Sequence, residues 1–427
     1  ALKRPFHKVM TGTLKPILGY LMLAAGAGVI VNNLDPLGKM IEHGFHITGV
    51  VPNNEAIVAV AQKVLGVETM SILVVGLLMN LCIARFTKFK YVFLTGHHSL
   101  FMACLMSAVL GTAGLSGMEL ILVGGFLMGA WSAISPAIGQ SYTSKVTDGD
   151  EIAIGHFGSL GYYLSAWVAQ YVGKAEDSTE DIEIPEKWGF LRDSTLSTAL
   201  TMIVFYLIAA IAAGSEFVST LSGDMSPYLY AVMSAMNFAV GVTIVYSGVR
   251  MILGDLIPAF QGIATKIIPN AIPAVDCAVF FTYAPTAVVL GFLSSFIGGI
   301  IGMLILGAVG GVLIIPGLVP HFFCGATAGI YGNATGGRRG AAVGAFLNGL
   351  AITFLPALAL PVLGQLGFQN TTFGDADFAV MGLVLGHAFE WIGMAGIYGI
   401  VAIAALVLII PNFIKTKGKV INYVEEE

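Results

Sequence analysis

Charge is what this chain has least of, because only 11% of its 427 residues are Asp, Glu, Lys or Arg. The basic residues form no stripe, so no nucleic-acid partner is expected. GxxxxGK[ST] loops, HExxH pairs and dinucleotide-binding glycine patterns are all missing, which argues against nucleotide and zinc-hydrolase sites. Four cysteines, Cys82, Cys104, Cys277 and Cys324, lie in apolar segments without metal-binding spacing. We expect them to be buried as small hydrophobes, and we expect no metal or other cofactor.

Hydrophobic residues are abundant instead, at 56% of the chain with a mean hydropathy of +0.86. This composition predicts an all-α integral membrane protein embedded in a lipid bilayer. Its 54 glycines suit close packing between membrane helices. We expect about nine to eleven transmembrane helices, starting from apolar runs near residues 14–31, 69–86, 92–110, 118–138, 195–213, 229–252, 287–315, 341–363 and 381–410.

Polar landmarks inside these apolar segments occur twice, in the same order. Residues 28–36 (GVIVNNLDP) are echoed roughly 220 residues later by residues 250–258 (RMILGDLIP). Further pairs follow at similar spacing: Pro52–Glu55 with Pro273–Asp276, Gly96–His97 with Pro320–His321, and Gly155–His156 with Gly386–His387. Repeated, interrupted spans with polar residues at matching places are typical of a transporter's substrate site.

The basic residues indicate how the two copies are oriented. Arg85, Lys88 and Lys90 precede His97, whereas the stretch before His321 is uncharged and basic residues follow it at Arg338 and Arg339. Short cytoplasmic loops are enriched in Lys and Arg. Because the basic loop precedes the histidine in one copy and follows it in the other, the two copies are predicted to be inverted structural repeats. We expect a first repeat at 1–172, an acidic cytoplasmic linker at 173–192, and an extra span plus the inverted second repeat at 193–427. The basic tail after residue 414 predicts a cytoplasmic C-terminus.

Two segments combine prolines, amides and an acid with short apolar stretches, at 52–66 and 269–285. Irregular backbone at membrane depth is tolerated only where it is buried in protein or lines a cavity, so we interpret both as re-entrant hairpins. Glu55 and Asp276 occupy matching places in them. An acid in an apolar segment is a functional-site hypothesis by default, although either carboxylate can equally cap a hairpin helix.

Histidines supply the other candidates. His97 and His98 begin one span, and we expect at most one of them, His97, to face a site. His321 is its echo in the second half, and His156 follows Gly155 after the acids Asp148, Asp150 and Glu151. Three acids near a histidine could suggest a metal, but ligand spacing is lacking. His156 is better suited to bind a substrate hydroxyl or to act on it as a general base.

Several longer motifs carry a family resemblance. These are Leu94–His97, Val146–Gly149 with Ile154–His156, and the run from Ile268 through Asp276 to Val289, extended by Ile314–Gly317 and Gly325–Thr327. With them the chain resembles, over nearly its whole length, the ascorbate-type membrane component of the bacterial phosphoenolpyruvate-dependent sugar phosphotransferase system. That component is enzyme IIC, often called the UlaA or SgaT family.

The resemblance implies a homodimer in which each subunit has a substrate-binding core domain and a dimerising scaffold domain, in the bacterial cytoplasmic membrane. L-ascorbate, or a related sugar acid or polyol, would bind at His97, His156, Asp276, Asn54 and Glu55, with His321 as a further candidate from the repeat. Asp276 or His156 would assist attack of a substrate hydroxyl on phosphorus. The phosphoryl donor would be the phosphocysteine of a separate cytoplasmic EIIB protein, which EIIA supplies. Members usually begin with one further hydrophobic segment, so the resemblance implies an N-terminal helix before Ala1.

The residues leave one alternative open. A secondary transporter of the same inverted-repeat design could be coupled to protons through Glu55 and Asp276. The two readings differ in their energy source, because one needs a phosphoryl donor and the other needs only a proton gradient.

Overall fold

The computed structural model describes residues 5–46, 49–52, 54–182, 194–266, 268–364 and 371–413, which are mostly helical. The predicted all-α membrane architecture is confirmed. The described residues contain seven helices long and apolar enough to cross a membrane, or eight if one sharply bent pair forms a single span. This is fewer than the nine to eleven expected. The reason is length: α3 (Gly96–Thr112) and α11 (Ala376–Ile392) have 17 residues and α5 (Ser159–Val172) has 14, whereas a bilayer needs about 20.

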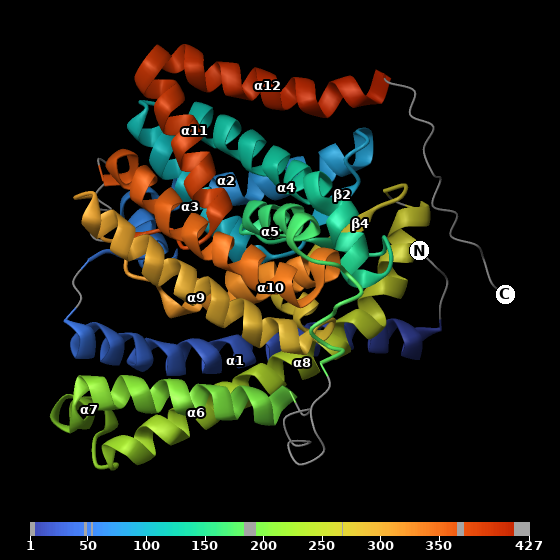
Figure 1. Ribbon diagram of the computed structural model, residues 1–427. Helices are drawn as coiled ribbons and strands as arrows, with labels where there is room; N and C mark the ends of the chain where they lie inside the picture. The colour runs from blue at the N-terminus through green and yellow to red at the C-terminus, as the bar shows by residue number, and fades with distance from the viewer. Residues whose placement is uncertain are drawn as a thin grey trace.

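One layer of the molecule consists of α1 (Phe6–Phe45), α6 (Ser194–Ala213), α7 (Ser215–Ser222) and the first part of α8 (Pro227–Lys266), whose far end runs past α1 to the other helices, as Figure 1 shows. Helices α1 and α8 are each 40 residues long and pack against one another. Helices α6 and α7 form the bent pair, at 116°. Buried small and apolar residues of α1, α6 and α8 join this layer into one hydrophobic core with α9 and α10.

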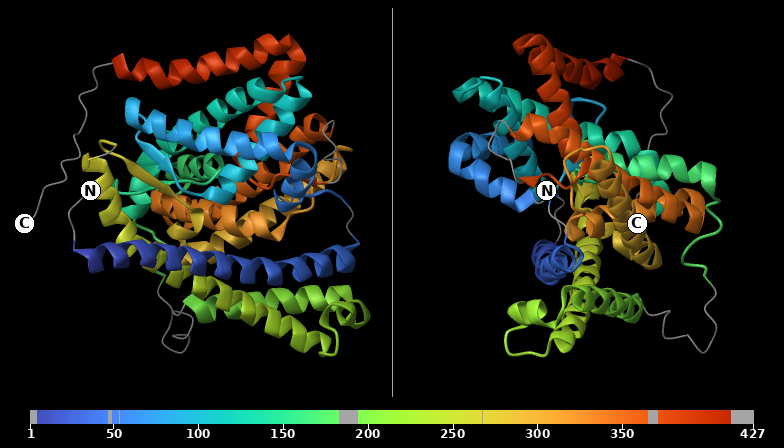
Figure 2. Two further views of the ribbon diagram at one scale, coloured as in Figure 1. Left: turned by 180° about the vertical axis from the view of Figure 1, so that it is seen from behind. Right: turned by 60° about the vertical axis from the view of Figure 1, so that its left-hand side comes forward.

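The second layer contains the remaining helices. In it α2 (Asn54–Phe86) packs on α4 (Gly117–Thr147) and α3, and α10 (Leu318–Gly364) packs on α9 (Pro285–Ala308) and α5. Helix α12 (Met394–Phe413) lies on the outside, farthest from α1, in both views of Figure 2. Its large side chains are mostly exposed, as expected for a lipid-facing helix.

Two long helices are interrupted. Helix α2 breaks at Leu65, and α10 breaks at Gly336 and Gly337, where Gly337 has a φ of +59° that favours glycine. Residues 173–182, the described part of the expected linker, pack against the α10 break, where the Arg338 amide donates to the Asp177 carbonyl. The stretch around Arg338 is therefore a helix break and not a free loop.

Glycine lets α9 and α10 approach closely. A Cβ atom on Gly349 of α10 would lie 2.0 Å from the Ser295 carbonyl oxygen of α9. We therefore expect Gly349→Ala to destabilise the fold by about 1–3 kcal/mol through overpacking, measured as a lower thermal midpoint of the detergent-solubilised protein. Gly399→Ala on α12 is the control, because nothing lies within 4 Å of its Cβ position. Equal midpoints for the two variants would contradict close α9–α10 packing.

Short parallel strands connect the two halves of the chain. Strand β4 (Ile272–Val275) pairs with both β2 (Tyr91–Phe93) and β3 (Ala153–Ile154). Strand β1 (Val51–Pro52) pairs with β5 (Thr371–Thr372), and the adjacent Val50 bridges to Ile314. In each group the middle strand comes from one half and its neighbours come from the other. The carboxyl ends of parallel strands meet at one edge, so residues from both halves are brought together there.

Candidate functional site

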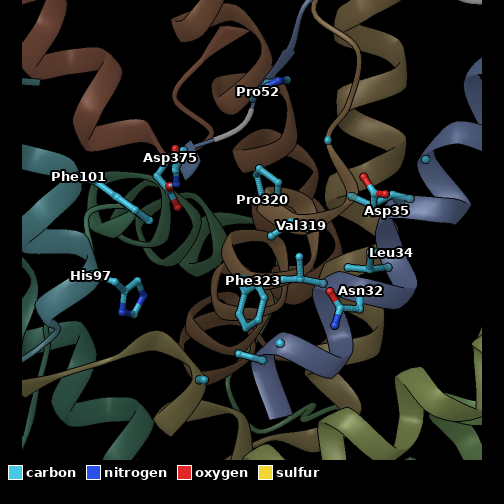
Figure 3. A pocket seen from close by; sticks show the side chains of 18 of the residues that line it. Asn32, Leu34, Asp35, Pro52, His97, Phe101, Val319, Pro320, Phe323 and Asp375 are labelled. Atoms are coloured by element: carbon cyan, nitrogen blue, oxygen red, sulfur yellow. Dashed lines mark hydrogen bonds between the residues drawn. The ribbon is translucent and has the colours of Figure 1, made fainter. Parts of the chain in front are cut away.

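A cavity of about 810 Å³ lies between α1 and the second layer. Figure 3 shows His97 and Asp375 on one side of it, Asn32 and Asp35 on the opposite wall, and Phe323 between them. The polar residues lining it are Asn54, His97, His98, His156, Asp276 and Asp375 on the second-layer side, and Asn32, Asp35, Lys39 and Glu42 on α1. Mixed polar and apolar lining of this volume suits a small polar solute.

Asp276 and His97 form the first polar pair. Asp276 directly follows β4 and caps the 3₁₀ helix η2 (Cys277–Thr282), since its Oδ1 accepts a hydrogen bond from the Ala278 amide at 3.0 Å. Its Oδ2 lies 3.4 Å from Nε2 of His97, which begins α3 shortly after β2. The β2–β4 pairing therefore places the carboxylate beside the imidazole. Asp276 both caps a helix and faces the cavity, so the two readings of this acid coexist.

His156 reaches the same edge because it follows β3, the other neighbour of β4. It is only 3% exposed, and its Nδ1 accepts hydrogen bonds from the Gly158 amide at 3.2 Å and the Tyr162 hydroxyl at 2.8 Å. An Nδ1 that accepts an N–H donor carries no proton, so the neutral ring holds its proton on Nε2. His156 thus offers a hydrogen-bond donor from the other side of its ring.

The neighbouring His98 is held in the same way. Its Nδ1 accepts from the Phe157 amide at 3.3 Å, and its ring centroid lies 3.7 Å from that of His156. It also lines the cavity, together with His97. The start of α3 thus presents both adjacent histidines to the cavity, whereas we expected only His97 to face a site.

Asn54 and Asp375 form the second polar pair, at the edge made by β1 and β5. The Asn54 Nδ2 donates to Asp375 Oδ2 at 2.6 Å, and its Oδ1 accepts from the Gly374 amide at 2.9 Å. Asp375 Oδ1 accepts from the Cys324 thiol at 2.8 Å and lies 4.0 Å from His156 Nδ1. Asn54 thus holds Asp375 at the β1–β5 edge of the cavity.

Two groups in the cavity region have ligand atoms close enough for a metal ion: His98, His156 and Asp375, and His156, Asp276 and Cys277. A metal would need an unprotonated ring nitrogen directed at it. In both histidines Nδ1 already accepts backbone N–H donors, which keeps the proton on Nε2. The arrangement suits donors and acceptors for hydroxyl groups better than metal ligands.

The other expected residues are placed differently. His321 is 1% exposed, bonds through Nδ1 to the Ser295 hydroxyl at 2.9 Å, and does not line the cavity. Glu55 lies in the first turn of α2, and its side chain is outside the described residues. His387 lies late in α11 and contacts Glu390 and Trp391 rather than the cavity.

Asp375 is the residue that the sequence reading missed. It is buried, at 4% exposure, and stands in Gly374-Asp375-Ala376-Asp377 between apolar segments. Acids in such a setting are functional candidates by default, so the signal was present. The repeated histidines indicated His387 instead, which lies 12 residues further along the chain.

Comparisons with known proteins show the family to which the chain belongs. Residues 1–377 match the model of the family described as the sugar-specific permease component of the phosphotransferase system. An ascorbate-specific EIIC component of that system from Mycoplasma pneumoniae (strain ATCC 29342 / M129 / Subtype 1) is similar to this chain, with 26% identity over an alignment 395 residues long. The alignment covers 78% of this chain. The match spans 59% of the length of that relative. This chain therefore belongs to the family of sugar-specific permease components of the phosphotransferase system.

Proposed function

We propose that this chain is the membrane permease, EIIC, for phosphorylation-coupled uptake of L-ascorbate or a closely related sugar acid or polyol. The observation that carries the proposal is the convergence of imidazole donors and carboxylate acceptors in one cavity. A polyhydroxylated solute needs both kinds of partner at once. The relative named for ascorbate supports this substrate class.

In this proposal the substrate passes inward and meets a phosphocysteine of a cytoplasmic EIIB protein, which EIIA has charged. A substrate hydroxyl attacks phosphorus, the bond from phosphorus to the cysteine sulfur breaks, and the thiolate leaves. Asp276 accepts the hydroxyl proton on Oδ2, which lies at the cavity wall facing His97. Its Oδ1 keeps the hydrogen bond from the Ala278 amide. The imidazoles of His97 and His156 hold the remaining oxygens.

The inverted-repeat prediction belongs to the same proposal. Its support is the exchange of strands between halves, in which β4 of the second half lies between β2 and β3 of the first, while the segment of β1 lies between Ile314 and β5. The equal lengths of α1 and α8 agree with it. We propose that α2 to α5 and η2 to α11 form the core domain with two re-entrant hairpins.

The layer of α1, α6, α7 and α8 would then be the scaffold through which two subunits dimerise. Several side chains of α1, α6 and α8 are apolar and exposed in one subunit, among them Leu21, Val204, Ile208, Met236 and Val240. We place the protein in the bacterial cytoplasmic membrane with a cytoplasmic C-terminus, following the distribution of basic residues.

The energy source tests the proposal. Membrane vesicles containing the protein should accumulate labelled L-ascorbate only when phosphoenolpyruvate and the soluble phosphocarriers are supplied, and the labelled product inside should be phosphorylated. Vesicles without the protein are the control. Accumulation of unmodified solute driven by a proton gradient alone would favour the alternative, a secondary transporter coupled to protons through Glu55 and Asp276.

A further inference from the structure

Asp375 has an unusual set of partners for a buried carboxylate. One oxygen, Oδ2, is bonded to the Asn54 amide at 2.6 Å, while the other, Oδ1, is bonded to the Cys324 thiol at 2.8 Å. Cys324 is fully buried. A thiol is a weak hydrogen-bond donor. Oδ1 therefore has a partner but can still accept a stronger hydrogen bond from a hydroxyl group.

Asp375 lies at the wall of the cavity, where a bound solute would meet it. Asp375 lines the cavity, whereas Cys324 is not among the residues that line it, and Figure 3 shows Asp375 on the same side as His97. Both carboxylate oxygens are acceptors, and His156 Nδ1, 4.0 Å away, is an acceptor as well. No strong donor from the described residues therefore competes for Oδ1.

We propose that Asp375 is a direct substrate contact, whose Oδ1 accepts a hydrogen bond from a substrate hydroxyl in place of the Cys324 thiol. Its Oδ2 stays bonded to Asn54, which keeps the carboxylate oriented. This inference rests on the proposed function, because it requires a hydroxylated solute in the cavity. A carboxylate cannot donate, so Asp375 binds a neutral hydroxyl and faces away from any anionic oxygen of the substrate.

The chain also offers a matched control acid. Asp377 lies two residues further along, is fully buried and is absent from the cavity lining. It accepts from the Ser159 hydroxyl at 2.8 Å, the Leu160 amide at 2.9 Å and the Trp131 indole at 3.2 Å, and so ties α11 to α5 and α4. Its role is structural, in contrast to that of Asp375.

The test measures equilibrium binding of L-ascorbate, galactitol and xylitol to the purified full chain, together with the thermal midpoint of each variant. We expect Asp375→Asn to lower affinity for the bound compound about 10- to 100-fold. An amide NH2 group in the place of Oδ1 is a donor and cannot accept a hydrogen bond from the substrate hydroxyl. Asp377→Asn should lower the thermal midpoint and leave affinity within about twofold of the wild type.

Two changes at Cys324 separate a substrate contact from a structural brace. Cys324→Ser supplies a stronger donor to Oδ1, which competes with the substrate, so affinity should fall; Cys324→Ala removes the competitor, so affinity should stay equal or rise. If Asp375 only braced the fold, the effects would be reversed, with serine harmless and alanine harmful.

The outcomes are distinguishable. Wild-type protein that binds none of the three compounds would overturn the proposed function and this inference with it. Wild-type protein that binds one of them while Asp375→Asn binds it equally well would overturn the inference alone, as would the reversed order at Cys324.

Discussion

Asp276→Asn is expected to lower the rate of phosphoryl transfer to the substrate by about 10²–10⁴-fold, the usual contribution of a positioned general base. Asparagine keeps an oxygen that can accept from the Ala278 amide and so preserves the cap of η2. It cannot accept the proton of the attacking hydroxyl. The measurement is formation of phosphorylated L-ascorbate in vesicles supplied with phosphorylated EIIB.

The control for Asp276 is an exposed acid that does not line the cavity. Asp148→Asn fits, because Asp148 is exposed and its φ of 58° is one that asparagine tolerates. Its transfer rate should equal that of the wild type. Transfer by Asp276→Asn within about threefold of the wild-type rate would remove Asp276 from the chemistry.

His156→Asn is expected to abolish measurable substrate binding while the protein stays folded. The Asn side-chain oxygen can take the place of Nδ1 as acceptor for the Gly158 amide, so the local backbone keeps its partner. The Nε2–H donor on the other side of the ring is lost. His156→Ala should also lose binding, but it leaves the Gly158 amide and the Tyr162 hydroxyl without their partner, at about 1–3 kcal/mol for each buried group.

Tyr162→Phe is the matched control for His156. It removes one hydrogen bond to Nδ1 but keeps the imidazole and its Gly158 contact. We expect affinity for L-ascorbate to change by less than about tenfold, the size of one neutral hydrogen bond. Equal affinities of wild type and His156→Asn would show that His156 does not contact the substrate.

Much of the site was predictable because its residues stand out against an apolar background. Asp276, His97 and His156 were predicted from residue type and position, Asn54 was predicted from the family resemblance, and the structure brings these four to one cavity. His321 was named by the same reasoning, yet it is packed between helices beside Ser295. A buried histidine satisfied by one neighbour and a histidine that faces a cavity have the same appearance in a sequence.

The repeat pattern did not indicate Asp375. It matched His156 with His387 by their positions in the two copies, whereas β5, through its pairing with β1, brings Asp375 to within 4.0 Å of His156. Strands of two residues, such as β1, β3 and β5, are too short to show a period-2 pattern. Their pairing partners are residues about 320 positions away in the case of β1 and β5, and only the folded chain reveals them.

By itself the sequence determined that this protein is built of membrane helices, because its charge is low and its apolar runs have the length that a helix needs to cross a bilayer. It also marked the interrupted segments and most polar residues of the cavity, since each is costly in an apolar environment. Only the tertiary structure decided which of them meet. The parallel pairing of short strands from opposite halves joins Asp276 to His97 and Asn54 to Asp375, and those contacts depend on three-dimensional register that local sequence does not encode.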